Sequence, residues 1–206
     1  MNRNILIGSL VAILLLMVWS FIFVYQLPAM KTDAAPLSTK LQVPDDMGGP
    51  FTLTDQDGKE TSSTAFKDKY KLVYFGFTHC PAICPTELQK IAQAMKLMGP
   101  STAAQIQPIL ISVDPERDTP AVLKEYVPMF DIGLVGFTGS KDDIEKIKRQ
   151  YRVYAAKVDD PNASEYSVDH SSYIYLLDHH DKVVDLYATE DSARTIATRV
   201  QGVLGE

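Results

Sequence analysis

The chain of 206 residues has no run of lysine or arginine, and its formal net charge is −6. Binding to nucleic acid depends mainly on neutralising phosphates, so nucleic acid is not an expected partner. The sequence also has no internal repeats or low-complexity tract beyond its N-terminal apolar run. It contains only two cysteines and four histidines. Any site built from these side chains therefore has few candidates.

Charge is also missing near the N-terminus, where no residue from Asn4 to Met30 has a charged side chain at neutral pH. The almost unbroken apolar run over 5–25 is long enough to cross a bilayer as a helix, which takes roughly 20 residues. It exceeds the apolar core of about 7–15 residues in a cleavable signal peptide. No cysteine follows it, which argues against a lipoprotein. We therefore expect residues 1–25 to form a single membrane anchor.

The residues around this run predict how the chain is oriented. Arg3 and the amino terminus precede the apolar run, and the positive-inside tendency would keep them cytoplasmic. Residues 26–40 contain Pro28 and Pro36 and show no periodicity. This composition is typical of a tether.

Residues 41–206 have the length of one globular domain. Runs typical of strands lie at 51–54, 71–77, 109–113, 134–137, 172–177 and 183–187. Helical spacing and capping signals predict helices over 85–98, 119–129, 141–151 and 191–204. This order predicts an α/β, thioredoxin-like fold with an N-terminal β-hairpin and a helical insertion.

The two cysteines lie where the strand over 71–77 passes into the first helix. Cys80 and Cys84 are four positions apart, about 6 Å along a helix axis, so their sulfurs can reach one ion or each other. The start of a helix favours thiolate, and we expect it to lower the thiol pKa values. A dithiolate prefers Cu(I), and an added imidazole lets a site also hold Cu(II).

The four histidines differ in how well their positions suit this missing ligand. His79 should face away from the sulfurs, because neighbouring residues at a strand end point to opposite sides. His179 and His180 fall in a predicted surface turn. We expect His170 in a loop just before the first strand of the terminal hairpin, and a thioredoxin-like topology would place this loop against the cysteine loop. A lone histidine is more often structural, so this assignment depends on the topology.

Several segments together resemble the Sco/SenC family of copper proteins. They are Tyr74–Glu87, which contains both cysteines, Ile111–Pro120, Leu134–Ser140 and Val168–Ser171. The resemblance implies that Cys80, Cys84 and His170 bind one copper as Cu(I) or Cu(II). It also implies a role in assembling the dinuclear copper site of cytochrome c oxidase. The expected partners are the copper-bearing oxidase subunit and a copper donor protein.

With the predicted anchor, the resemblance implies an inner-membrane protein whose domain faces the periplasm. No Arg- and Ser-rich leader precedes the apolar run, which makes the mitochondrial intermembrane space less expected. Many family members carry an acidic residue between the cysteines, where this chain has Ala82. Asp169 either orients His170 or stabilises a turn. We interpret Asp114–Asp118 as an acidic lead-in to a helix capped by Thr119, and not as part of the site.

Two functions remain open for the cysteine pair. One is a copper metallochaperone without catalytic turnover, and the other is a thiol-disulfide oxidoreductase acting on a partner's cysteines. The CxxxC spacing, the placed histidine and the lack of a proline just before the terminal hairpin favour copper. A peroxiredoxin-like role is least favoured, since the cysteine loop contains Thr78 but no arginine.

Overall fold

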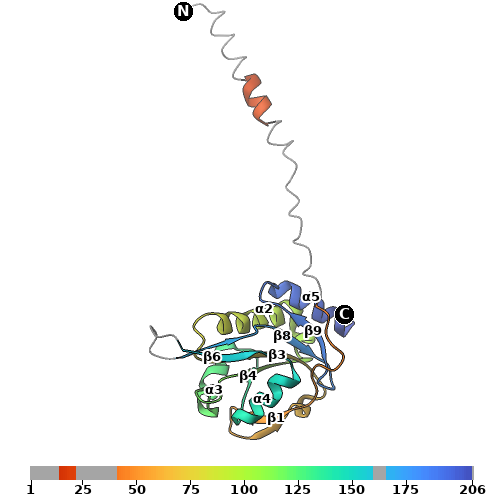
Figure 1. Cartoon of the computed structure of the whole chain (residues 1–206). Coiled ribbons are helices and arrows are strands. Elements are labelled where there is room, and N and C mark those ends of the chain that lie inside the picture. Colours follow the sequence, from red (N-terminus) through yellow and green to blue (C-terminus); the bar gives the residue numbers. More distant parts are fainter. Residues whose placement is uncertain (1–13, 22–40, 160–165, 206) are drawn as a thin grey trace, which may run out of the picture. The chain divides into compact units, whose positions relative to one another are not determined.

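The computed structural model describes residues 14–21, 41–159 and 166–205. The chain divides into two units, Met1–Ser38 and Thr39–Glu206. In the first unit, residues 14–21 are helical. Figure 1 shows the elements of the second unit.

A seven-stranded sheet organises the second unit, with the strand order β2-β1-β5-β4-β3-β8-β9. The three central strands β3, β4 and β5 are parallel, and all other neighbours are antiparallel. The strands are β1 (Thr52–Asp55), β2 (Glu60–Ser62), β3 (Tyr70–Gly76), β4 (Ile106–Ser112), β5 (Val135–Thr138), β8 (Ile174–Leu177) and β9 (Val183–Tyr187). The predicted N-terminal hairpin is present as β1–β2, and Gly58 provides the positive φ of its turn.

Helices cover both faces of this sheet (Figure 1). The helices α2 (Ile83–Ala103) and α5 (Ala193–Leu204) pack together on one face. The helix α4 (Lys141–Gln150) lies on the opposite face. The connection from β4 to β5 contains α3 (Pro120–Tyr126) and the 3-10 turn η2 (Val127–Phe130). This arrangement confirms the predicted mixed α/β, thioredoxin-like fold.

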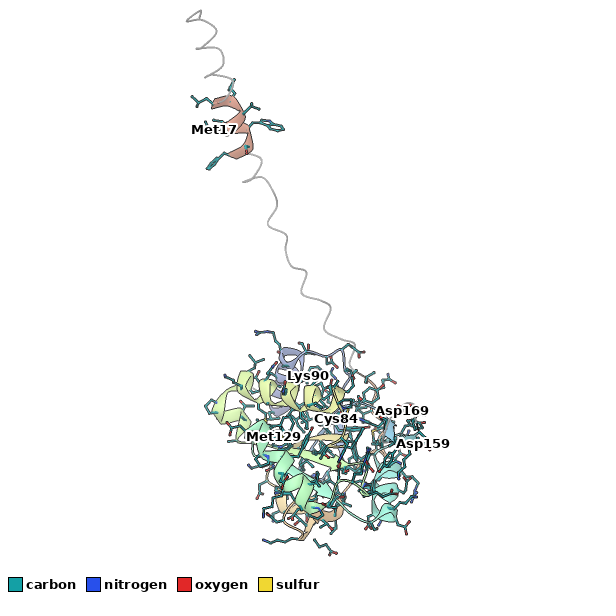
Figure 2. All side chains as sticks on the ribbon, turned by 90° about the vertical axis from the view of Figure 1, so that its left-hand side faces the viewer. Met17, Cys84, Lys90, Met129, Asp159 and Asp169 are labelled. Carbon is teal, nitrogen blue, oxygen red and sulfur yellow. The ribbon has the colours of Figure 1, made fainter. Side chains whose placement is uncertain are left out.

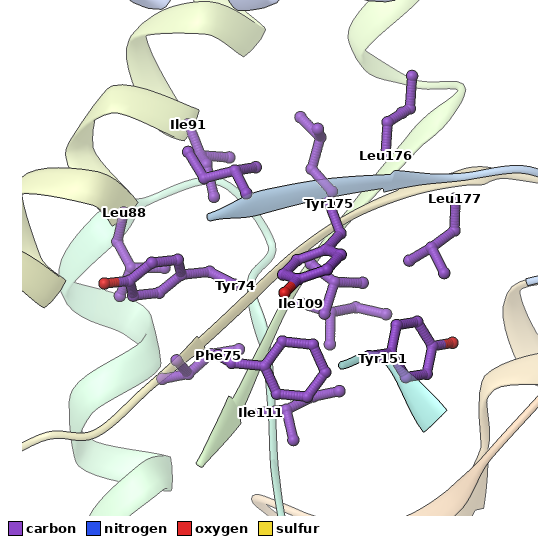
Figure 3. Packing of buried hydrophobic residues seen from close by; sticks show 14 of the residues in the cluster. Tyr74, Phe75, Leu88, Ile91, Ile109, Ile111, Tyr151, Tyr175, Leu176 and Leu177 are labelled. Carbon is purple, nitrogen blue, oxygen red and sulfur yellow. The ribbon is translucent and has the colours of Figure 1, made fainter. Parts of the chain in front are cut away.

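The core lies on both faces of β3 and β4, whose side chains are almost all buried. Figure 3 shows how their alternating side chains separate: Tyr74 lies beside Leu88 of α2, while Phe75 lies near Tyr151 and Ile111. The ring centroids of Phe75 and Tyr151 are 5.5 Å apart. Continuous apolar strands of this kind are buried on both sides, as the sequence predicts.

Local capping signals predict helix starts well. The Ser140 hydroxyl accepts a hydrogen bond from the Asp143 amide, and the Asp143 carboxylate accepts one from the Ser140 amide. Thr119 caps α3 in the same way, through the Val122 amide. Helix α2, by contrast, does not end at Met98: Gly99 breaks it with a φ of 79° and a ψ of 166°, and a further helical turn follows from Pro100. Proline is well tolerated in the first turn of a new helical segment.

A second, two-stranded sheet was not predicted. It pairs β6 (Ala155–Val158) with β7 (Ser167–His170), and His170 lies opposite Ala155. The expectation that His170 lies in a loop is therefore wrong, because it is the last residue of a strand. Asp169 is likewise an exposed strand residue opposite Ala156 and not a turn residue. These strands have no strict alternation of apolar residues, so their pattern gives little strand signal.

The predicted anchor over 1–25 and tether over 26–40 lie mostly outside the described residues. Among the helices that the structure describes, none is both long and apolar enough to cross a membrane. The anchor and the tether remain predictions.

Candidate metal centre

The two cysteines lie at the carboxyl end of β3 and in the first turn of α2. Cys84 is completely buried, whereas Cys80 is partly exposed. The Cys84 amide donates a hydrogen bond to the Cys80 sulfur over 3.4 Å. Ala82 is the N-cap residue of α2 and provides no side-chain acceptor. The Cys80 sulfur thus accepts the hydrogen bond that a capping oxygen would otherwise receive.

His170 reaches this pair from β7. Its Nε2 lies 3.4 Å from the Cys84 sulfur, and its Nδ1 lies 3.2 Å from the Ser171 carbonyl oxygen. If Nδ1 carries the proton and donates a hydrogen bond to that carbonyl, Nε2 has a free lone pair facing the sulfur. The imidazole packs edge-to-face against Phe77 and Tyr74, with centroid distances of 5.7 Å and 6.0 Å. The fold thus brings the three predicted donors together.

Glycine at position 76 is required by this packing. A Cβ atom there would lie 3.1 Å from the Cys84 sulfur and 2.6 Å from Cε1 of Tyr74. Both distances are shorter than ordinary contacts. Gly76 therefore lets the buried thiol approach the end of β3.

The other three histidines lie away from the donors. His79 is exposed, its Nδ1 lies 3.0 Å from the Thr78 hydroxyl, and it lines a separate depression with Tyr126 and Met129. His179 is exposed, with Nδ1 3.0 Å from the Lys67 carbonyl oxygen, and His180 is exposed beside it.

Burial changes the expected acidity of the inner thiol. Desolvation raises the pKa of Cys84 to about 12, and the neighbouring Cys80 also raises it. The expectation that the helix start lowers the thiol pKa is therefore wrong for Cys84. Removal of the sulfur from water destabilises the thiolate more than the helix start stabilises it. A bound cation would reverse this balance, because metal binding displaces the thiol proton.

Burial also lowers the pKa of His170 below its ordinary value of 6.5. The unfolded chain therefore binds a proton on this imidazole at a higher pH than the folded chain does. We expect metal-free protein to lose stability as the pH falls from about 6.5 toward the lower pKa of the folded state. Urea unfolding of residues 39–206 and of its His170→Gln variant at several pH values measures this. Stability curves that stay parallel across this range would contradict it.

The segment Asp114–Asp118 does more than lead into α3. The Asp118 carboxylate is buried and accepts hydrogen bonds from the Thr78 amide, the Thr78 hydroxyl and the Ser112 hydroxyl. Asp118 follows the end of β4, the strand next to β3, and from there it fixes the start of the cysteine loop. The resemblance over Ile111–Pro120 was the only sequence signal for this contribution.

The donor set suits a soft metal ion. Thiolates select Cu(I), and imidazole is a common ligand of Cu(II). Cys80 and His170 line one open depression, and Cys84 lies buried behind it. Figure 2 labels Cys84 within the domain and Asp169 near its surface. Counting only histidine, cysteine and carboxylate side chains of the described residues, no group of three or more is already arranged to hold an ion.

Fold and site together define a thioredoxin-like protein with a cysteine pair after its central strand β3 and a histidine at the end of β7. The family model SCO1/SenC matches residues 39–205. The chain therefore belongs to the SCO1/SenC family, which is known for copper binding and cytochrome c oxidase assembly.

Individual relatives agree with this assignment. The SCO2-like protein of Rickettsia felis is 36% identical over 185 residues, which cover 86% of this chain and 88% of the relative. The copper-bound structure of Bradyrhizobium japonicum ScoI is 41% identical, with a TM-score of 0.67, covering 76% of this chain and 98% of that one. The copper-bound structure of Arabidopsis thaliana ScoI is 38% identical, with a TM-score of 0.72, and the match covers 78% of this chain and 99% of that one.

Proposed function

We propose that this protein is a copper metallochaperone that binds one Cu(I) or Cu(II) through Cys80, Cys84 and His170. The observation that carries the proposal is the contact of 3.4 Å between the Cys84 sulfur and Nε2 of His170. The residues in contact are 86 positions apart, with Cys84 in helix α2 and His170 in strand β7. Copper-bound relatives with the same fold support the choice of metal.

Exposure of the donors favours delivery by ligand exchange. Cys80 and His170 face the same open depression, whereas Cys84 is enclosed. An incoming thiol or imidazole of a recipient would therefore first replace the two accessible donors. Cys84 would release the ion last, because its sulfur has no exposed surface.

The recipient that we propose is the copper-bearing subunit of cytochrome c oxidase, with the ion supplied by a copper donor protein. Residues 1–25 would anchor the chain in the inner membrane, with the domain in the periplasm. At this location the dithiol site could contact an extracytoplasmic partner. The location also allows the cysteines to form a disulfide when copper is absent.

A transfer experiment tests the proposed delivery. Copper-loaded full-length protein is mixed with the metal-free, reduced copper-site domain of the oxidase subunit, and copper and thiols are followed separately. We expect copper to move to the recipient without a change in total thiol content. Copper that stays on the donor at equilibrium, with the recipient reduced throughout, would exclude delivery to this partner.

The second candidate function is a thiol-disulfide oxidoreductase. It is favoured by the position of the Cys80 sulfur against the Cys84 amide, which holds the two free cysteines at one helical turn. Metal-free, reduced protein is therefore also mixed with the oxidised recipient. If this protein lost two thiols and the recipient gained two, and the first experiment showed no copper transfer, the result would favour the oxidoreductase.

A further inference from the structure

The segment Asp114–Asp118, which joins β4 to α3, contacts both parts of the chain that carry the donors. On one side, the Asp118 carboxylate accepts hydrogen bonds from the Thr78 hydroxyl over 2.6 Å and from the Thr78 amide over 3.1 Å. Thr78 is two residues before Cys80. The carboxylate is buried and also bonded to Ser112 over 2.6 Å, so the start of the cysteine loop has a fixed support.

On its other side, the same segment holds the residue that precedes β7. Nε of Arg117 donates to the Asp114 carboxylate over 2.5 Å, and the Tyr166 hydroxyl donates to that carboxylate over 2.8 Å. Nη1 of Arg117 donates to the Tyr166 carbonyl oxygen over 3.0 Å. The guanidinium also lies 3.8 Å from the centre of the Tyr166 ring. Backbone and side chain of Tyr166 are thus both fixed.

These contacts lie close to the histidine. Tyr166 directly precedes β7, which runs from Ser167 to His170. The Phe77 ring is near both groups, with its centre 5.8 Å from the Arg117 guanidinium and 5.7 Å from the centre of the His170 ring. Among the strands that the structure describes, β7 pairs with β6 alone, so the sheet by itself holds it weakly. The position of the imidazole therefore depends on the contacts at Tyr166.

We propose that Arg117 and Asp118 are positioning residues that set the distance between the thiol pair and the imidazole. Asp118 fixes the cysteine loop, and Arg117 fixes β7 through Tyr166. Neither touches the metal. The inference rests on the proposed copper function and adds to it a division of roles: Arg117 controls the donor needed for Cu(II), and Asp118 controls the donors needed for both oxidation states.

The test compares Arg117→Gln and Asp118→Asn in full-length protein in detergent. Cu(I) affinity is measured by competition with a chromophoric chelator, and Cu(II) affinity by titration of the thiolate-to-copper absorption band. We expect Arg117→Gln to lower Cu(II) affinity about 10- to 100-fold, the usual cost of losing an outer-shell partner, and to leave Cu(I) affinity near that of the wild type. Asp118→Asn should lower both affinities. Arg152→Gln is the matched control, because Arg152 pairs with Asp46 on the exposed surface.

A second measurement uses metal-free protein. Amide hydrogen exchange of β7 should become faster in Arg117→Gln and stay unchanged in Asp118→Asn and Arg152→Gln. If wild-type protein bound no copper but exchange in β7 still rose in Arg117→Gln, the proposed function would fail and the support of β7 by Arg117 would stand. If Arg117→Gln lowered Cu(I) and Cu(II) affinity equally, or changed neither, the positioning role would be overturned.

A milder variant covers the case in which Arg117→Gln does not fold. Tyr166→Phe removes the hydroxyl bonded to Asp114 but keeps the aromatic ring beneath the guanidinium. We expect it to lower Cu(II) affinity by a smaller factor than Arg117→Gln and to leave Cu(I) affinity unchanged. Arg117→Lys keeps the charge but not the planar fork, and it should restore only part of the Cu(II) affinity. Full Cu(II) affinity in both variants would contradict the inference.

Discussion

Replacement of Cys84 by serine is expected to abolish Cu(I) retention by this protein. The serine hydroxyl is a hard, weak ligand for a soft ion, and it replaces the donor that contacts Nε2 of His170. Cys84 is also the only buried member of the donor set, so water cannot easily supply a substitute ligand. The loss of affinity should exceed the roughly 10- to 100-fold typical of an outer-shell change.

Competition with a chromophoric Cu(I) chelator measures this loss, with the metal content after gel filtration as a second readout. Cys80→Ser should also lose Cu(I), whereas His170→Gln should mainly weaken Cu(II). His180→Gln is the matched control, because this imidazole is exposed in the turn between β8 and β9. Full copper retention by the variant that lacks both cysteines would refute the site.

The second large effect concerns stability and comes from a buried ion pair between β3 and the turn that precedes β9. Nζ of Lys71 lies 2.9 Å from Oδ1 of Asp181, and both side chains are at most 2% exposed. The Ser63 hydroxyl donates to the other carboxylate oxygen over 2.8 Å. We expect Asp181→Ala to lower the free energy of unfolding by about 3–5 kcal/mol, because it leaves the Lys71 ammonium buried without its partner.

Urea unfolding of residues 39–206 measures this change. The double variant Lys71→Met/Asp181→Asn removes both charges and should recover much of the loss, because no charge is left buried, the amide oxygen can still accept from Ser63, and asparagine tolerates the φ of 63° at this position. Asp46→Ala, which breaks the exposed pair with Arg152, is the control and should change stability little. An Asp181→Ala variant as stable as the control would mean that the ion pair contributes nothing to folding.

Features that depend on neighbouring residues were predictable from the sequence. Gly58 needs a positive φ in the first hairpin, and Ser140 and Thr119 cap helices through amides three residues away. The placement of Cys80 and Cys84 between β3 and α2 belongs to the same group, because a buried strand followed by helical spacing fixes it. The motif around them was also enough to indicate the family.

The sequence was less informative where contacts cross between distant segments. The sequence does not predict the pair β6–β7, because its strands lack regular alternation of apolar and polar residues. As a result, His170 was assigned to a loop. Asp114–Asp118 was interpreted only as a helix lead-in, since the contacts with Thr78 and Tyr166 join residues 40 and 52 positions apart.

The sequence by itself determined the order of the main strands and helices and the cysteine pair at the start of α2, and with the family resemblance it predicted His170 as the third donor. Only the tertiary structure decided how these groups behave. It buries Cys84 and so raises the pKa of this thiol, and it places His170 at the end of β7. It also brings the segment Asp114–Asp118 into contact with the start of the cysteine loop and with the residue that precedes β7. The reason is physical: spacing and capping depend on a few adjacent residues, whereas desolvation and donor geometry depend on which distant segments fold against them.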